Sequence, residues 1–290
     1  MSNKTSLYIG LMSGTSADGI DLALVKFDDD VTQHANGATL IASYYQAYDK
    51  QLHNRIVALY EPGHSEIDRL GSLDIELATL FSKAINTFIA QQNLTTSDIT
   101  AIASHGQTIR HRPTQTDLIS TPFTLQIGCL QTLATLTDIR VIGDFRRKDL
   151  ILGGQGAPLV PAFHRAIFNA QDNDVFVANI GGIANITYIP QNASESTAGF
   201  DTGPGNALLD FWYQQHHSDQ FDNGGKWAAS GKVNQDLLKV LLQDPYFNLT
   251  APKSTGREYF NAHWLAQFSL PLKHRPADVQ ATLSQLTAPV

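Results

Sequence analysis

The chain has 290 residues, of which 42% are hydrophobic and 16% are charged, and its formal net charge is −7. This composition excludes a disordered chain. The acidic balance argues against a partner such as nucleic acid or a membrane surface, which usually selects a basic face. A single cysteine, Cys129, excludes an internal disulfide and is expected to be an inert core residue. No apolar run reaches the roughly 18 residues of a membrane helix, so we expect a cytoplasmic protein. The length of the chain suits about two domains.

The N-terminal half of the sequence alternates predicted strands with predicted helices. Residues 6–12 and 19–27 are predicted strands that flank a glycine-rich turn, and residues 65–92 carry apolar side chains at helical spacing. Further strands are predicted at 99–103, 121–128 and 139–145, with a short helix at 129–137. This alternation indicates an α/β fold with a mixed or parallel sheet and covering helices.

The sequence changes character at Gly153, where "GGQGAPLVPAF" is rich in glycine and proline. We therefore place a domain boundary there, which gives a first domain of residues 1–152 and a second domain of residues 153–290. In the second domain, "VFVANIGGIANITYIP" repeats the strand, glycine turn and strand of the N-terminus. A unit that occurs once in each half indicates two related domains that face a shared cleft.

The first glycine-rich turn has two interpretations. In one, Asp18 and Gly19 simply close a hairpin. In the other, the turn binds phosphate, because Gly14 lets a ligand approach the backbone closely. The hydroxyl donors available around it are Ser13, Thr15 and Ser16. The second turn, at 181–182, favours phosphate binding, since two such turns could grip a phosphate chain from both sides.

Two basic stretches are candidates for binding an anion. His105 ends a predicted strand and suits a structural role as well as a functional one, and residues 110–112 follow it with two arginines and a histidine. The segment "DFRRKD" is either a solvated turn with compensating charges or a site where Arg146 or Arg147 holds a carboxylate or phosphate through paired hydrogen bonds.

The segment "GFDTGPGN" carries the strongest chemical signal. Asp201 leaves a predicted strand and enters a rigid loop before a helix. It could only bridge the loop, but a carboxylate fixed beside backbone N–H donors is how a general base is built, and we favour that role. Further along, Lys253, Arg257 and Glu258 in "KSTGRE" either contact a ligand or line a surface loop, and both interpretations stay open.

Seven segments of the chain together resemble the anhydro-N-acetylmuramic acid kinases of bacteria. They occur in the family's order across essentially the whole chain: "GLMSGTSADGID", "SHGQTIRH", "DFRRKD", "GGQGAPLVPAFH", "NIGGIANIT", "GFDTGPGN" and "PKSTGRE". The resemblance implies the ribonuclease H-like fold of the actin, Hsp70 and sugar-kinase superfamily. In that fold two α/β domains, each with a mixed five-stranded sheet, close over a nucleotide.

The same resemblance implies an ATP-dependent reaction on 1,6-anhydro-N-acetylmuramic acid, a product of peptidoglycan turnover. Water attacks the anomeric carbon and opens the anhydro bridge, while O6 receives the γ-phosphoryl group of ATP. The products are N-acetylmuramic acid 6-phosphate and ADP. Asp201 matches the family's catalytic aspartate and would activate the water. A homodimer in the bacterial cytoplasm is implied as well.

The resemblance also assigns residues to ATP and to the metal. Those assigned to ATP are Gly10, Met12, Ser13, Gly14, Thr15, Ser16, Asn179, Gly181 and Gly182. Mg²⁺ is the implied metal. Many proteins of the superfamily carry an aspartate on the first strand, where this chain reads "YIG", so the metal ligand is open and Asp18 and Asp21 are the candidates.

Another group of residues is assigned to the sugar by the resemblance. Its members are Ser104, His105, Gln107, Arg146 and Arg147. The substrate carries a lactyl carboxylate, which is the target implied for one of the two arginines.

The chain departs from the family at its C-terminus. Family members continue beyond "ADVQATLSQLTA" with the rest of a helix and a glycine-rich strand and turn that holds adenosine, whereas this chain stops at Val290. We therefore expect that the C-terminal part is missing. The alternative is a natural short form with impaired ATP binding.

Two other classes of function compete with the kinase. One is a non-catalytic module that binds a nucleotide or muropeptide, and the other is an actin-like assembly protein that shares only the fold. An intact "DTGPGN" around Asp201 favours the kinase, because a binding module has no need of a base that activates water.

Overall fold

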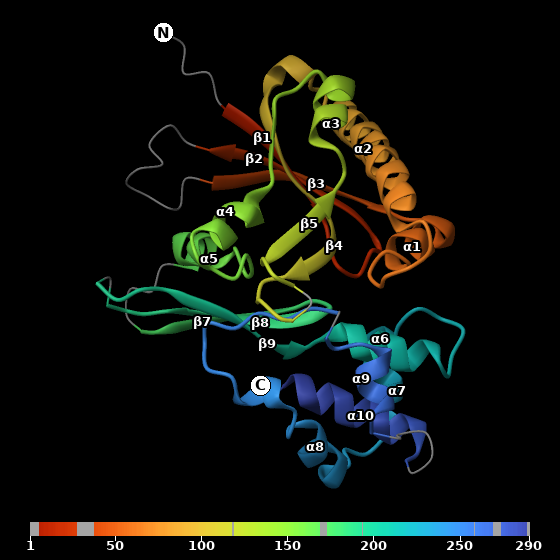
Figure 1. Cartoon of the computed structure of the whole chain (residues 1–290). Helices are drawn as coiled ribbons and strands as arrows, with labels where there is room; N and C mark the ends of the chain where they lie inside the picture. Colours follow the sequence, from red (N-terminus) through yellow and green to blue (C-terminus); the bar gives the residue numbers. More distant parts are fainter. Residues whose placement is uncertain are drawn as a thin grey trace. The chain divides into compact units, whose positions relative to one another are not determined.

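The chain forms two compact units in the computed structural model, Met1–Gly156 and Ala157–Val290 (Figure 1). The structure describes residues 6–27, 38–117, 119–168, 173–192, 194–257, 259–268 and 274–288. Glu258 lies outside these described residues. The boundary predicted between residues 152 and 153 falls a few residues before the division between the units.

The first unit is built on a mixed sheet with the order β3-β2-β1-β4-β5, and β6 pairs with β4. The strands are β1 (Ser6–Ser13), β2 (Gly19–Phe27), β3 (Ala38–Ala47), β4 (Ile99–Arg112), β5 (Phe123–Ile127) and β6 (Val141–Gly143). The pairs β1–β4 and β4–β6 are parallel, and the other pairs are antiparallel. The predicted α/β fold with a mixed sheet is therefore confirmed.

The described residues of the first unit form a sheet of six strands, whereas five were predicted. The difference arises because β4 is 14 residues long. Its first half pairs with β6 and its second half with β5, on the same side. One long strand thus provides an edge for two short ones.

The core of the first unit lies between this sheet and helix α2 (Glu66–Gln91), whose predicted position is confirmed. One face of α2 carries a buried apolar row that includes Leu73, Leu77, Phe81 and Ile85. Alternate sheet residues meet it, because successive side chains of a strand point to opposite faces; they include Ile9, Leu11, Leu22 and Leu24. The other helices of this unit are α1 (Lys50–Val57), α3 (Leu130–Thr137) and α4 (Phe145–Ile151), with the short η1 (Thr96–Asp98).

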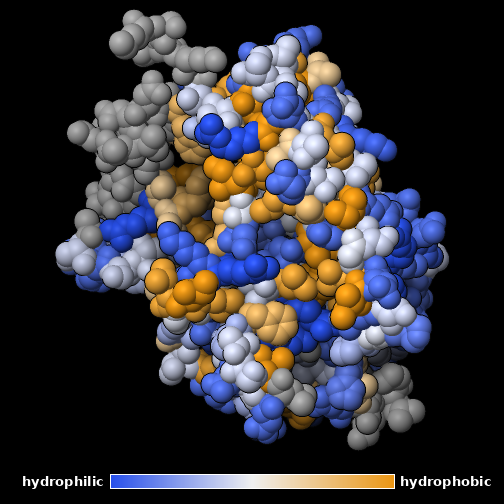
Figure 2. All heavy atoms as spheres, turned by 45° about the horizontal axis from the view of Figure 1, so that its top comes forward, coloured by the Kyte–Doolittle hydropathy of each residue, from blue (hydrophilic) through white to orange (hydrophobic). Residues whose placement is uncertain are grey.

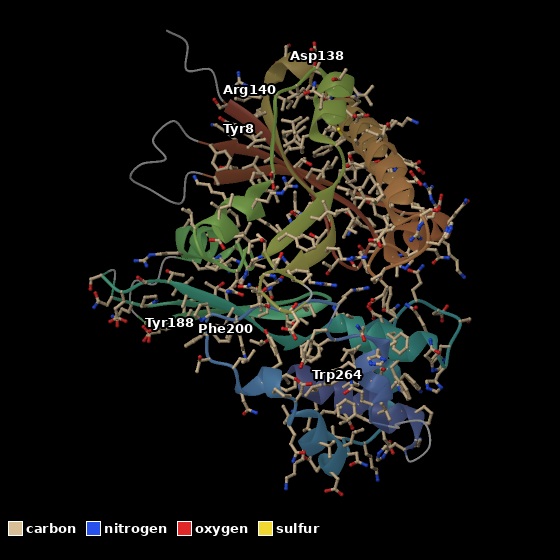
Figure 3. The ribbon with its side chains drawn as sticks, in the orientation of Figure 1. Tyr8, Asp138, Arg140, Tyr188, Phe200 and Trp264 are labelled. Carbon is tan, nitrogen blue, oxygen red and sulfur yellow. The ribbon has the colours of Figure 1, made fainter. Side chains whose placement is uncertain are left out.

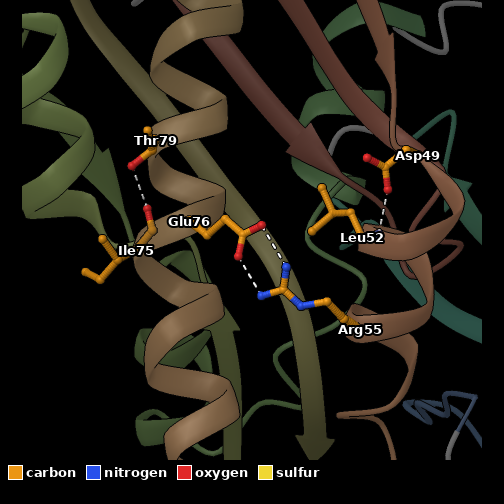
Figure 4. A network of polar contacts seen from close by, with 6 residues as sticks. All are labelled: Asp49, Leu52, Arg55, Ile75, Glu76 and Thr79. Atoms are coloured by element: carbon orange, nitrogen blue, oxygen red, sulfur yellow. Dashed lines mark hydrogen bonds and ion pairs between the residues drawn. The ribbon is translucent and has the colours of Figure 1, made fainter.

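Helix α1 is joined to α2 by polar contacts (Figure 4). Arg55 donates two hydrogen bonds to the Glu76 carboxylate, at 2.8 and 2.5 Å. Asp49 caps the start of α1 by accepting from the Leu52 N–H at 2.7 Å. Both partners of the ion pair are partly exposed, so the pair orients the helices more than it stabilises them.

The second unit combines a three-stranded antiparallel sheet, in the order β7-β8-β9, with several short helices. The strands are β7 (Val175–Ile180), β8 (Ile183–Ile189) and β9 (Ala198–Pro204). The helices are α5 (Pro161–Phe168), α6 (Asn206–Gln214), α7 (Lys226–Ser230), α8 (Gln235–Leu241), α9 (Ala262–Ala266) and α10 (Pro276–Thr287), with η2 (Asn223–Gly225) and η3 (Pro245–Asn248). The described residues of this unit form three strands, whereas a five-stranded sheet was predicted for each domain.

The core of the second unit is helical and aromatic. Trp212 from α6, Phe260 just before α9, and Trp264 from α9 are buried together with apolar residues of α8 and α10. Figure 3 shows Trp264 among these helices, where its indole N–H donates to the Asp244 carboxylate at 2.7 Å. A buried indole N–H usually requires such an acceptor.

Apolar and hydrophilic side chains are interspersed over the face of the molecule shown in Figure 2. The exposed large apolar side chains of the first unit include Met12, Leu40, Tyr45 and Phe145. Among the described residues, none of the helices has the length and apolar character needed to cross a membrane.

The packing of α2 generates a stability prediction. Phe81 is fully buried, whereas Ile67 on the same helix is 85% exposed. Replacing Phe81 by Ala leaves a cavity, so we expect a loss of about 3–5 kcal/mol in the free energy of unfolding. Ile67→Ala is the matched control and should change it by about 0.5 kcal/mol or less. Urea denaturation measures both, and equal losses would contradict the assigned packing of α2.

Candidate active site

In the first unit, a network of buried polar side chains holds the turn between β1 and β2. Ser13 Oγ lies 2.6 Å from Gln107 Oε1, 3.0 Å from the Gly19 carbonyl and 2.8 Å from the Tyr48 hydroxyl. Burial raises the pKa of Tyr48, so its hydroxyl stays protonated and can donate to Ser13. Ser13 and Gln107 are both fully buried. The hydroxyl of Ser13 is therefore engaged inside the protein.

The carbonyl groups of this turn point inward. Gln107 Nε2 donates to the Gly14 carbonyl at 3.0 Å and to the Tyr60 hydroxyl at 3.2 Å. Tyr60 in turn donates to the Thr15 carbonyl at 3.0 Å. The C=O and N–H of a trans peptide point in opposite directions, so the N–H groups of Thr15 and Ser16 point away from this network. Outward N–H groups on a turn are suited to binding an anion.

A pocket of about 470 Å³ lies on the sheet face opposite to α2. Gly10 and Met12 line it, together with Asp21, Tyr45 and His105. A Cβ added at Gly10 would have the Ala23 carbonyl, at 4.0 Å, as its nearest neighbour. None of the described residues thus demands a glycine at that position, and the space that they leave there is open to a ligand.

The two metal candidates lie at the β1–β2 hairpin. Asp18 accepts a hydrogen bond from Ser16 Oγ at 2.7 Å. Burial, and then the nearby Asp18 carboxylate, raise the pKa of Asp21. In the described part of the chain, no three His, Cys, Asp or Glu side chains cluster in a way that could hold a metal.

Arg146 is fixed against His105 at the end of the candidate site. Arg146 Nε donates to His105 Nε2 at 2.9 Å, and its Nη1 donates to the Gly156 carbonyl at 2.7 Å. His105 Nδ1 lies 2.9 Å from the Gly106 carbonyl, so this nitrogen carries the proton. The Gly156 N–H donates to Asp149 at 2.7 Å, which folds the loop after α4 back onto the helix.

Two histidines near Arg146 are held neutral. Burial and the positive charge of Arg146 lower the pKa of His105 to about 4. Burial, followed by Arg146 and Arg112, lowers the pKa of His111 to about 4 as well. Both rings are therefore uncharged at neutral pH.

The other residues assigned to the sugar are placed differently. Arg147 is 56% exposed and forms an ion pair with Asp144 at 3.4 Å. Ser104 is buried, and its hydroxyl has no hydrogen-bond partner among the described residues. The structure thus brings His105, Gln107 and Arg146 into contact networks and leaves Arg147 on the surface.

In the second unit, the glycine turn between β7 and β8 also has its carbonyls engaged. The carbonyl of Gly181 accepts from the Asn206 N–H at 2.7 Å, and that of Gly182 accepts from Gly205 and Ala207 at 3.0 and 3.1 Å. The N–H groups of Gly182 and of the next residue consequently point the other way. A Cβ at residue 205 would lie 2.3 Å from the Gly181 carbonyl, so this close approach requires a glycine.

A row of three polar residues crosses the sheet of the second unit. Asn179 on β7 lies opposite Asn185 on β8, which lies opposite Asp201 on β9. Cross-strand partners project from the same face. The register shifts between Ala184 and Asn185, so β9 has a bulge beside Asp201. Bulges of this kind redirect a side chain, and here the Thr202 hydroxyl donates to the Ala184 carbonyl at 3.2 Å.

Asp201 is 5% exposed and is held from both its side chain and its backbone. Its Oδ2 accepts from Ser254 Oγ at 2.9 Å and from the Thr255 N–H at 3.0 Å. The Asp201 N–H donates to the Lys253 carbonyl at 3.1 Å, and the Tyr246 hydroxyl donates to the Asp201 carbonyl at 2.7 Å. A buried carboxylate with fixed donors is suited to accepting a proton in a defined direction.

The sequence did not identify several of these contacts. Ser254 and Thr255 lie in the "KSTGRE" segment, in which the sequence points to the charged residues. Tyr48 and Tyr60 carried no local signal, because their partners are 35 and 45 residues away in sequence. Polar residues flanked by a glycine, as in "STG", were the available hint for Ser254 and Thr255.

Comparison with known proteins gives a consistent family. The model of the family described as anhydro-N-acetylmuramic acid kinase matches residues 6–290. An anhydro-N-acetylmuramic acid kinase of Colwellia psychrerythraea is 54% identical over 99% of this chain and 76% of its own length. One of Saccharophagus degradans is 52% identical over 98% of this chain and 75% of its length. The chain thus spans about three quarters of the length of these relatives.

Among solved structures, YeaZ from Pseudomonas aeruginosa is similar over 69% of this chain and 68% of its own. The sequence identity is 14% and the TM-score is 0.26. A likeness this weak carries no argument about the fold.

The neutral histidines generate a pH prediction. Unfolded histidine has a pKa near 6.5, so the unfolded chain binds more protons than the folded one between about pH 4 and 6.5. The free energy of unfolding should therefore fall as the pH drops through this window, by at most about 3 kcal/mol for each ring. Urea denaturation from pH 7.5 to 4.5 measures the slope, which should be shallower in His105→Gln. An unchanged slope in this variant would contradict the assignment.

The two arginines of α4 generate a paired prediction. Arg146→Ala removes two hydrogen bonds made by a charged donor, so the free energy of unfolding should fall by about 1.5–3 kcal/mol. The pKa of His105 should rise, because a nearby positive charge is lost. Arg147→Ala is the surface control and should cost about 0.5 kcal/mol or less. Thermal unfolding and an NMR titration of the imidazoles check both, and similar results for the two variants would contradict the structure.

Proposed function

The chain belongs to the anhydro-N-acetylmuramic acid kinase family, and from that premise we propose its reaction and the roles of its residues. The substrates are 1,6-anhydro-N-acetylmuramic acid, ATP and water, and the products are N-acetylmuramic acid 6-phosphate and ADP. The reaction belongs to the recycling of peptidoglycan in the bacterial cytoplasm.

The chemistry couples two bond exchanges. The oxygen of water forms a bond to the anomeric carbon as the bond from that carbon to O6 breaks, and O6 forms a bond to the γ-phosphorus as the β–γ bridge breaks. The proton of the water goes to a carboxylate base. A glycosidase normally needs a second carboxylic acid to protonate its leaving oxygen. Here the phosphoryl group caps that oxygen, so one carboxylate is sufficient.

The observation that carries the proposal is the setting of Asp201. Its carboxylate is buried, lies beside a bulge, and accepts from Ser254 and Thr255 through one oxygen. We assign it as the base that takes the proton of the attacking water. A non-catalytic binding module is not favoured, because such a module would gain nothing from a carboxylate fixed in this way.

The two glycine turns support the binding of ATP phosphates. In each turn the carbonyls are bonded to the protein, so the N–H groups of the following residues point outward. A Cβ at Gly181 would have only the Ile183 carbonyl, at 3.6 Å, as a neighbour within 4 Å, and the space at Gly10 is similarly open. Open space at a glycine fits a ligand that approaches the backbone.

Mg²⁺ fits the donors present at the β1–β2 hairpin. This ion usually keeps several waters and takes only one or two protein carboxylates besides the phosphates, and Asp18 and Asp21 are the carboxylates available on this hairpin. When bound, Mg²⁺ supplies neutralisation of the charge that develops during phosphoryl transfer. Arg146, oriented by His105, is the cation we assign to the lactyl carboxylate of the sugar.

We propose further that the two units are domains of the actin-like fold, and that the enzyme is a homodimer. Support for the first comes from the repeated strand, glycine turn and strand in β1–β2 and β7–β8. The dimer rests on the family resemblance alone.

The assigned base gives a direct test of function. Asp201→Asn should lower kcat by about 10²–10⁴-fold, the usual contribution of a general base, because the amide cannot take the proton. Formation of the 6-phosphate from ATP, Mg²⁺ and the anhydro sugar measures the rate. In ¹⁸O-labelled water the parent should place the label on the anomeric carbon and none on phosphate.

Asp219→Asn, at an exposed position of the same unit, is the control and should keep the parental rate. Retention of the parental rate by Asp201→Asn would show that another group activates the water. No turnover by the folded parent chain would overturn the proposed function itself.

A further inference from the structure

We propose that Ser254, together with the N–H of Thr255, is the positioning group that orients the Asp201 carboxylate and keeps it ionised. This inference rests on the proposed role of Asp201 as the base. It assigns a role to the "KSTGRE" segment, whose function the sequence left open.

The contacts converge on a single oxygen. Ser254 Oγ and the Thr255 N–H both donate to Asp201 Oδ2, at 2.9 and 3.0 Å. Two donors on one oxygen fix the rotation of the carboxylate about its side-chain bond. Ser254 and Thr255 thereby determine which oxygen of Asp201 takes a proton, although they lie 53 and 54 positions after it in the sequence.

The segment is itself anchored to the strand that carries Asp201. The Asp201 N–H donates to the Lys253 carbonyl at 3.1 Å, which continues the pairing of β9 beyond the sheet. Lys253 Nζ donates to the Tyr246 carbonyl at 3.3 Å and lies 4.8 Å from the centre of the Tyr246 ring. Ser254 is thus presented by a backbone that cannot move without breaking these contacts.

The surroundings make the donors to Asp201 important. Tyr246 belongs to an aromatic cluster with Phe247, Tyr259 and Phe260, and Asp201, whose carbonyl Tyr246 contacts, is 5% exposed. Burial, and then the charge of Asp201, raise the pKa of Tyr246, so its hydroxyl remains a donor. Burial of a carboxylate favours its neutral form, whereas donors to the charged form oppose that effect. Ser254 and Thr255 are placed to supply this opposition.

Lys253 and Arg257 are charged residues of the same segment, and burial lowers the pKa of Lys253. Its ammonium group lies 5.9 Å from the centre of the Phe200 ring on β9. The contact between Lys253 and Asp201 is made by the backbone carbonyl of Lys253, which accepts from the Asp201 N–H. The side-chain donor to be tested is therefore Ser254.

The test compares Ser254→Ala with the conservative Ser254→Thr in the full chain. Carbon-13 NMR of the aspartate carboxyl groups follows the titration of Asp201 directly, with Asp201→Asn used to assign its signal. Loss of the Ser254 hydroxyl should raise the titration midpoint of Asp201 by about one pH unit. The acid limb of kcat/KM should move up by the same amount, and Ser254→Thr should restore both values.

Ser230→Ala is the matched control, because Ser230 Oγ also donates to an oxygen in this unit, the Trp227 carbonyl, but at an exposed position. It should move neither value. If Ser254→Ala folds and leaves the Asp201 midpoint unchanged, the inference is overturned while the role of Asp201 stands. If Asp201→Asn is fully active, the proposed role of Asp201 as the base fails and the inference fails with it, whereas the proposed function fails only if the folded parent chain shows no turnover. If Ser254→Ala does not fold, Ser254→Cys, with its weaker S–H donor, should show a smaller shift in the same direction, and no shift would overturn the inference.

Discussion

In both units the orientation of a glycine turn depends on how its carbonyl groups are satisfied. In the first unit, the side chains of Gln107 and Tyr60 donate hydrogen bonds to the carbonyls of the turn. In the second unit, the backbone N–H groups of residues 205–207 are the donors. A buried carbonyl without a donor is costly, so each turn has one stable way to face. Because the peptide is rigid, that choice also directs the N–H groups outward. The phosphate binding proposed for the turns would thus be a by-product of internal hydrogen bonding, obtained in the two units with different donors.

The second unit also carries the proposed base, Asp201. The bulge in β9 turns Asp201 inward beside Asn185, and a distant segment supplies the donors that hold it. The proposed base therefore depends on three regions that are far apart in the sequence: the strand, the aromatic cluster around Tyr246, and the loop with Ser254. A substitution in any of these regions would alter the position of the carboxylate through its hydrogen bonds with Tyr246, Ser254 and Thr255.

The sequence predicted the parts of the structure that have a local period or a local turn. Helix α2 followed from its apolar spacing, and the two hairpins followed from glycine between strands. The sharing of β4 by two short strands was missed, because pairing depends on partners outside the window that defines a strand. Arg146 and Arg147 could not be separated, since a seven-residue helix gives too few turns to reveal which side is buried. Contacts such as Ser13 to Gln107 span 94 residues and leave no trace in local spacing.

The placement of His105 limits its reactivity. One ring nitrogen carries the proton donated to Gly106, and the lone pair of the other accepts from Arg146. With both nitrogens engaged and burial lowering the pKa of the ring to about 4, the imidazole has no lone pair to offer a transition-metal ion or an acylating reagent. A reagent that modifies histidines should therefore not react with His105 as long as the contact with Arg146 is intact. Modification of His105 at Nε2 would then report that the loop around Gly156, which Arg146 holds, has opened. This readout requires no enzymatic assay.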